Sequence, residues 1–167
     1  TIETGSGVKT LVLYKQNGKV TSVTVDMGKP LFASEEIPTS LVSVDVANCG
    51  FNENSNAVLP KKAVVNAPLI VAENEYRVTC VNVGNPHCVV FSKFVDKEPV
   101  AKIGPLFESH SVFPEKTNTE FVRVVGPNEL KMRTWERGNG ETLACGTGAC
   151  AAAVASVING FSPINQD

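Results

Sequence analysis

The sequence contains little that is typical of proteins that bind nucleic acids or span membranes. Lys and Arg number 15 against 17 Asp and Glu, for a net charge of −2, so no basic excess exists to bind a phosphate backbone. The longest uncharged apolar run, residues 143–164, consists largely of Ala, Gly, Thr and Ser and contains Asn159 and Pro163. Such a run is a poor membrane span. We therefore expect neither a nucleic acid nor a membrane among the partners.

The sequence also lacks a signal-peptide pattern, because no basic segment at the N-terminus is followed by an apolar stretch. It does not begin with Met, which suggests a processed or a cut chain. A length of 167 residues suits one ordinary domain, or one and a fraction. An apolar content of 43% with 19% charged residues excludes a disordered chain.

No two cysteines have the Cys-x-x-Cys spacing, and their number is odd. The five are Cys49, Cys80, Cys88, Cys145 and Cys150. This pattern favours neither a disulfide framework nor a zinc knuckle, so we expect no metal site. Free thiols are typical of a reducing compartment, and we therefore expect the protein in the cytoplasm.

Hydrophobic patterning predicts strands over most of the chain. Residues 8–14 and 20–27 form an expected hairpin, because the second arm alternates and Asn17-Gly18 between them is a strong turn signal. Residues 121–125 and 129–135 flank Gly-Pro-Asn and indicate a second hairpin. Further strands are expected at 63–71, 76–83 and 88–91, with a turn at 84–87. Residues 38–59 are interpreted as a strand followed by a loop.

Two helices are expected. Residues 99–109 have apolar side chains at roughly helical spacing, interrupted by Gly104-Pro105. Residues 149–158 follow a polar, glycine-rich loop at 137–141 and carry no charge on any face, which predicts a buried helix. Its small side chains suit a tight enclosure, such as the inside of a strongly curved sheet. The chain is thus expected to be β-rich, with one buried helix and one lesser helix.

The segment Ala-Cys-Gly-Thr-Gly-Ala-Cys at 144–150 lies at the start of that buried helix. Cys145 would face unpaired backbone N–H groups and the positive end of the helix dipole, which favour its thiolate. We expect it to be the most thiolate-like of the five cysteines. Gly146 would let the same N–H groups approach a carboxylate or phosphate, and Thr147 adds a hydroxyl. A helix start with a buried structural cysteine explains the same residues equally well.

Three further segments could hold polar ligands. Glu136 and Arg137 enter the glycine-rich loop and could bind an ammonium and a carboxylate, although a surface ion pair has the same pattern. His87 follows Asn85-Pro86, which turn chemistry also explains. Asn118 ends a polar loop. Each of these signals is weak to moderate by itself.

Taken together, the segments occur in an informative order. They are Gly-Asn-Pro-His at 84–87, Gly-Pro-Leu at 104–106, Phe-Pro-Glu-Lys-Thr-Asn at 113–118, Trp-Glu-Arg-Gly at 135–138, and Gly-Glu-Thr-Leu-Ala-Cys-Gly-Thr-Gly-Ala-Cys-Ala at 140–151. This arrangement resembles the diaminopimelate epimerase family over residues 23–160. The resemblance implies an isomerase that interconverts LL- and meso-diaminopimelate, on the lysine and peptidoglycan pathway, with two cysteines and no cofactor.

The resemblance also implies an α+β fold. Each of two similar domains would be a curved, antiparallel-rich sheet or barrel wrapped around a buried central helix, here at about 144–159, with the active site in the cleft between the domains. By this resemblance residues 1–30 are terminal strands of the first epimerase domain. Residues 31–167 are the second domain, incomplete at its C-terminus.

The family's functional residues map onto matching positions of this chain. The resemblance implies that Cys145 is one of the two catalytic cysteines, Glu136 the acid near the α-amino group and His87 the active-site histidine. Gly146 and Thr147 would hold the α-carboxylate. The distal end of the substrate would be bound by Asn85, Asn118 and Arg137.

One part of the family pattern is missing. The first catalytic cysteine of these enzymes lies in a Cys-Gly-Asn-Gly-Ala-Arg motif, which this chain lacks, and the residues after Cys49 do not match it. Inversion of an α-carbon needs a base on one face and an acid on the other. We therefore expect this chain alone to be inactive and the missing first domain to be its partner. The sequence also leaves open a homodimer of this chain.

Two other functional classes remain open. One is a different isomerase of the same superfamily, either proline racemase-like or phenazine-biosynthesis-like. Ligands for a distal end argue against it, because a proline-sized substrate needs none. The other class is a non-catalytic carboxylate-binding module, in which the helix start would bind an amino acid without turning it over. A purely structural domain is a third option.

Overall fold

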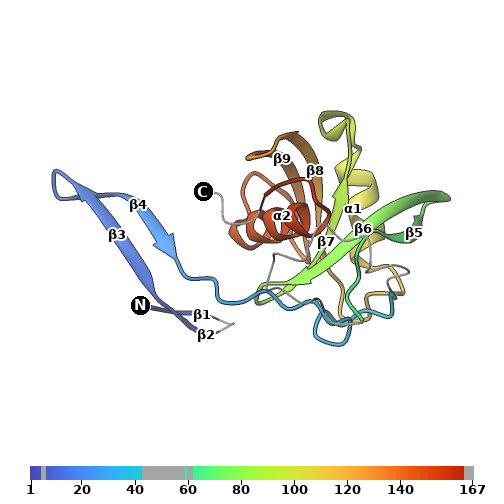
Figure 1. The fold of residues 1–167 in the computed structure, drawn as a ribbon, viewed down its shortest axis with the longest axis horizontal. Coiled ribbons are helices and arrows are strands. Elements are labelled where there is room, and N and C mark those ends of the chain that lie inside the picture. Colours follow the sequence, from blue (N-terminus) through green and yellow to red (C-terminus); the bar gives the residue numbers. More distant parts are fainter. Residues whose placement is uncertain (5–6, 43–58, 60–61, 164–167) are drawn as a thin grey trace.

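A mixed sheet with one helix on each face forms the body of the protein. The computed structural model describes residues 1–4, 7–42, 59 and 62–163. Its elements are β1 (Ile2–Thr4), β2 (Gly7–Lys9), β3 (Leu11–Gln16), β4 (Lys19–Val25), β5 (Ala67–Val71), β6 (Asn74–Asn82), β7 (Pro86–Phe91), the short 3-10 helix η2 (Val95–Lys97), α1 (Val100–Glu108), β8 (Asn118–Gly126), β9 (Glu129–Glu136), β10 (Gly140–Thr142) and α2 (Gly146–Ile158). Figure 1 shows β1–β4 lying apart from this body.

The sheet of the body has six strands in the order β10-β9-β8-β7-β6-β5. Neighbouring strands are antiparallel except β7 and β8, which are parallel, with His87 opposite Asn118. Parallel neighbours need a crossover connection, and α1 lies in it. The sequence pattern correctly predicts the β8–β9 hairpin, but it does not predict the parallel pairing.

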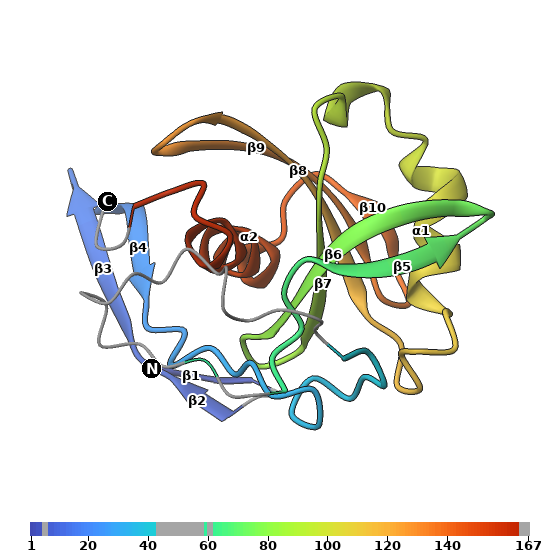
Figure 2. The same ribbon diagram turned by 45° about the vertical axis from the view of Figure 1, so that its right-hand side comes forward.

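The two faces of the sheet have separate cores because successive strand residues point to opposite sides. On the α1 side the core contains Val90, Phe107 and Phe121. On the α2 side it contains Val89, Val122 and Ala151. Figure 2 shows the two helices on opposite sides of the sheet. Polar side chains on the α2 side therefore gather beneath α2, even when they come from distant parts of the sequence.

The expected interruption of the first helix at Gly104-Pro105 is wrong. Helix α1 runs through both residues. A Cβ on Gly104 would lie 2.4 Å from Cδ2 of Trp135, so glycine here makes room for the indole of β9. Tertiary packing against the sheet thus outweighs the local cost of proline in the helix.

Helix α2 begins three residues before the predicted stretch and is buried on one side only. Ala151, Ala152 and Ala155 are buried, whereas Ala149 and Ala153 are exposed. In the described chain the predicted buried helix is therefore buried along one side, the side that the sheet covers. The α+β class is confirmed, and a curved sheet or barrel wrapped around the helix stays a prediction. Among the described residues, no helix is long and apolar enough to cross a membrane.

The N-terminal hairpin is confirmed as β3–β4, with Asn17 and Gly18 at positive φ in the turn. A second hairpin, β1–β2, precedes it and was not expected. Several other strand boundaries differ by two or three residues from the prediction, and β7 begins at Pro86, within the turn expected at 84–87. The strand expected at 63–71 begins at 67, and the loop expected at 137–141 contains the start of β10. The loop predicted within 38–59, which includes Cys49, lies mostly outside the described residues.

Candidate functional site

Cys145 lies at the N-terminal end of α2, as the sequence predicts. Its backbone is extended and caps the helix, and its Sγ accepts a hydrogen bond from the Gly148 N–H at 3.3 Å. The Thr147 hydroxyl lies 3.5 Å from the same sulfur. Unpaired N–H groups and the helix dipole make this end of a helix favourable for negative charge. The half-buried Cys145 therefore lies at a helix end that suits a bound anion such as a carboxylate.

His87 lies beneath this helix start, paired with a residue that the sequence reasoning missed. Glu120, on β8, places its Oε1 2.8 Å from Nδ1 of His87, and neither side chain has any exposed surface. Nε2 of His87 lies 2.9 Å from Oδ1 of Asn85. A signal for Glu120 was present in the sequence. It is a charged residue two positions after Asn118, directly before the apolar residues Phe121 and Val122.

Gly148 brings Glu120 and Cys145 together. A Cβ at Gly148 would lie 2.8 Å from Oε1 of Glu120 and 3.2 Å from Sγ of Cys145. Burial raises the pKa of Glu120, its contact with His87 acts in the opposite direction, and the charge of Glu136 adds to the increase. The buried pair and the helix start thus belong to one electrostatic cluster.

Glu136 joins the cluster from β9. Glu120 is opposite Thr134, and Thr134 is opposite Thr142 in β10, so these three side chains lie on the α2 face of the sheet. Glu136 lies on this face too, two residues beyond Thr134, and its Oε1 accepts a hydrogen bond from Thr142 Oγ1 at 2.5 Å. The structure therefore assembles a thiol, an imidazole and two carboxyl groups at one helix start.

Asn118 has a different setting from the free ligand that the sequence suggests. Its side chain is 4% exposed, its amide donates to the Pro86 carbonyl at 2.8 Å, and its Oδ1 accepts from the Arg137 N–H at 2.9 Å. The exposed guanidinium of Arg137 donates to the Glu115 carbonyl at 2.7 Å. Asn118 thus ties the turn between β9 and β10, which carries Arg137, to the starts of β7 and β8.

A second anchor of this turn is Glu108, which the sequence reasoning also missed. Its Oε1 accepts from the Gly138 N–H and the Lys116 ammonium, each at 3.1 Å, and its Oε2 accepts from the indole of Trp135 at 2.7 Å. Burial alone would raise the pKa of Glu108, but the hydrogen bonds from Trp135, Lys116 and Gly138 together lower it. The turn bearing Arg137 is therefore held by a carboxylate from α1.

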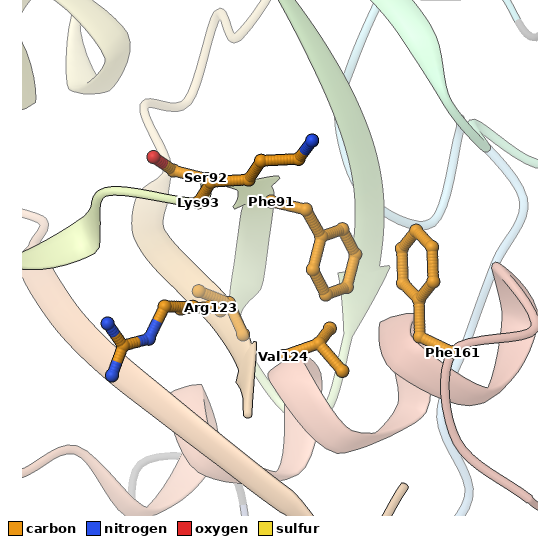
Figure 3. A pocket seen from close by; sticks show the side chains of 7 residues that line it. Phe91, Ser92, Lys93, Arg123, Val124 and Phe161 are labelled. Atoms are coloured by element: carbon orange, nitrogen blue, oxygen red, sulfur yellow. The ribbon is translucent and has the colours of Figure 1, made fainter. Parts of the chain in front are cut away.

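A pocket of about 360 Å³ lies elsewhere, near the C-terminal end of α2. Figure 3 shows Phe91, Val124 and Phe161 around it, with Lys93 and Arg123 nearby. The rings of Phe91 and Phe161 meet edge to face at 4.8 Å. Cys145 is at the opposite end of the helix, so this pocket is separate from the candidate site. Within the described ranges, no three His, Cys, Asp or Glu side chains are placed to hold a metal ion.

Comparisons with known proteins point to one family. A sequence profile described as diaminopimelate epimerase matches residues 79–166. A curated protein of that name from Methanococcus maripaludis is 46% identical over 161 residues, which cover 96% of this chain and 52% of that protein. Its namesake from Acetivibrio thermocellus is 47% identical over 161 residues, covering 96% and 51%. The one from Thermosynechococcus vestitus is 49% identical over 138 residues, covering 83% and 43%. The chain spans about half the length of the curated relatives it matches.

Proposed function

Because the chain belongs to the diaminopimelate epimerase family, we propose that it supplies one half of an active site that interconverts LL- and meso-diaminopimelate. The observation that carries this proposal is the position of Cys145, at a helix start beside His87, Glu120 and Glu136. The reaction would be a proton transfer at the α-carbon without a cofactor. It would serve lysine and peptidoglycan precursor synthesis, in the cytoplasm.

The geometry supports a division of roles. The backbone N–H groups of Gly146 and Thr147 would receive the substrate α-carboxylate, and so stabilise the charge that develops when the α-carbon loses its proton. Glu136 would pair with the α-ammonium group. Cys145, on one face of the α-carbon, would take the α-proton as a thiolate or deliver a proton as a thiol.

A complete inversion needs a second group on the other face. As a thiolate on one face removes the α-proton, a thiol on the other face donates its own, so the two sulfurs exchange protonation states in each turnover. The relatives are about twice as long as this chain, and we propose that their additional half contains the second cysteine. This chain alone would then be inactive.

The N-terminal strands fit a division into two domains. Val12, Leu13 and Tyr14 of β3 are each about half exposed, at 51–52%, although apolar side chains on a two-stranded ribbon need a cover to be stable. We propose that residues 1–30 belong to the first epimerase domain and pack against its remainder. Residues 31–167 would form part of the second domain. A homodimer stays a prediction.

The activity can be tested in a fusion of this chain with the N-terminal half of the Methanococcus maripaludis relative. In deuterium oxide, the fusion should incorporate deuterium at the α-carbon of diaminopimelate, and the 167-residue chain alone should not. Cys145→Ser in the fusion should lower the rate by about a thousand-fold or more. A fusion that binds diaminopimelate without exchange would indicate a carboxylate-binding module. Racemisation by the chain alone, at a rate near that of the fusion, would place both groups within it.

Asn85, Asn118 and Arg137 are proposed to bind the distal amino-acid end of the substrate, with Arg137 selecting for its carboxylate. The guanidinium of Arg137 is exposed and makes one hydrogen bond to a backbone carbonyl, which leaves N–H groups for a bidentate contact. Arg137→Lys in the fusion should therefore weaken turnover of diaminopimelate more than that of lysine, which lacks the distal carboxylate. Equal losses for both amino acids would contradict a role at the distal end.

A further inference from the structure

Glu120 is a buried carboxyl group to which the proposed reaction assigns no step. It has no exposed surface, and among the described residues its Oε2 has no hydrogen-bond partner. A buried polar atom without a partner costs free energy and is rare in folded proteins. An apolar residue at this position of β8 would avoid that cost. The presence of a carboxyl group therefore suggests a role beyond packing.

The surroundings of Glu120 point to that role. Its Oε1 contacts Nδ1 of His87 at 2.8 Å and lies 2.8 Å from the point where a Cβ of Gly148 would be. Cys145 Sγ lies 3.2 Å from the same point. Glu120 thus packs between the imidazole of His87 and the first turn of α2. It fits there because Gly148, as a glycine, has no Cβ to occupy the space.

We infer that Glu120 is a positioning residue of the candidate site, which holds the His87 ring in one orientation and places a carboxylate beside the helix start that carries Cys145. It would act through these two residues without touching the substrate. The inference deepens the proposed function and rests on it for the meaning of the site. The contacts that carry it are those of this chain alone.

The charged and titratable groups around Glu120 define what its removal should do. His87 faces Glu120 from β7, Glu136 from β9 and Cys145 from the start of α2. Cys88, on the other face of β7, interacts electrostatically with Glu120. Of these groups, His87 is the one that stabilises a negative charge on Glu120. Replacing Glu120 by Gln removes a carboxyl group packed against the helix turn that carries Cys145, while keeping the size of the side chain. A negative charge on Glu120 repels the electrons of the Cys145 sulfur, so Cys145 should react faster with an alkylating agent in this variant.

The first readout is the rate at which iodoacetamide alkylates Cys145 in the 167-residue chain, followed by peptide mass spectrometry across a range of pH. Glu120→Gln should raise this rate at neutral pH about five-fold or more, because a unit charge about 4 Å away has an effect of that size even in water and a larger one at a buried site. Thr119→Val is the matched control. Thr119 is the preceding residue of β8, equally buried, with a hydroxyl that also lacks a partner among the described residues, but it lies on the other face of the sheet. The Thr119→Val variant should leave the rate of Cys145 alkylation unchanged.

The second readout is the ¹⁵N signature of the imidazole rings, which is simple because the chain has two histidines. In the wild type, the ¹⁵N signals of the His87 ring should show one hydrogen-bonded arrangement, with Nδ1 bonded to Glu120. Glu120→Gln should weaken it. Glu120→Asp keeps the charge but shortens the side chain, so it should disturb the ring signal while leaving the Cys145 rate within about two-fold of wild type.

These two measurements do not depend on turnover, so an inactive fusion would refute the proposed function and leave their outcome unaffected. The inference is overturned if Glu120→Gln matches the wild type in both readouts, or if Thr119→Val shifts them as much. Should Glu120→Gln fail to fold, as judged by the fluorescence of Trp135, the Glu120→Asp variant decides. An unchanged His87 signal in that variant would then overturn the positioning role.

Discussion

Replacing Gly148 by Ala tests how closely the cluster beneath α2 is packed. A Cβ at this position would lie 2.8 Å from Glu120 Oε1, closer than the 3.0 Å that real Cβ atoms respect. Glu120 is fully buried and bonded to His87, so its carboxylate cannot move aside without breaking that contact. The added methyl group should therefore displace either α2 or the buried pair.

The size of the effect follows from two opposing contributions. Overpacking a core by one methyl group costs about 1–3 kcal/mol, whereas Ala is favoured over Gly within a helix by about 1 kcal/mol. Gly148→Ala should thus lower the free energy of unfolding by up to about 2 kcal/mol. Gly146, in the same helical turn, has no atom within 4 Å of its virtual Cβ. Gly146→Ala should be neutral or slightly stabilising.

Urea unfolding, followed by the fluorescence of the single tryptophan, Trp135, measures both variants under the same conditions. The midpoint of Gly148→Ala should fall below that of the wild type, while the midpoint of Gly146→Ala should not. Cys145 alkylation should change more in Gly148→Ala, because the methyl group also crowds the sulfur. Equal midpoints for the two variants would refute the close packing of Glu120 against α2.

Three further outcomes are expected. Gly104→Ala should cost about 3 kcal/mol and shift the emission of Trp135, because the new Cβ would lie 2.4 Å from the indole; an unchanged spectrum would contradict this packing. Burial acts to raise the pKa of Glu108, but hydrogen bonds outweigh it and lower this pKa below its ordinary 4.5. The stabilisation by the Glu108 carboxylate is therefore complete above about pH 5 and is lost as the pH falls through the lowered pKa. The difference in urea midpoint between wild type and Glu108→Gln should shrink on acidification, and a widening gap would speak against it. In alkylation at neutral pH, Cys145 should react well before Cys88, because burial raises the pKa of the Cys88 thiol and hides it; comparable rates would show that the core opens.

Local patterns in the sequence predicted much of the site. Cys145 in its glycine-rich segment marks a helix start, and Asn17-Gly18 marks a hairpin, because both depend on backbone preferences of adjacent residues. The order of the motifs indicated the family that the comparisons confirm. These features concern short stretches whose chemistry is legible from residue types alone.

The packing of distant residues could not be predicted in this way. Glu120 and Glu108 were missed because their importance arises from partners far along the chain, His87 for the first and the turn after β9 for the second. The parallel pairing of β7 with β8 aligns His87 with Asn118, and no local pattern specifies which strands become neighbours.

The sequence by itself thus determined the helix start that carries Cys145, most of the strands and the membership of the family. The tertiary structure alone decided that Glu120 lies between His87 and α2, and that α2 is buried on one side only. The physical reason is that secondary structure follows from nearby residues, whereas burial and buried polar contacts depend on which surfaces meet when the whole chain folds.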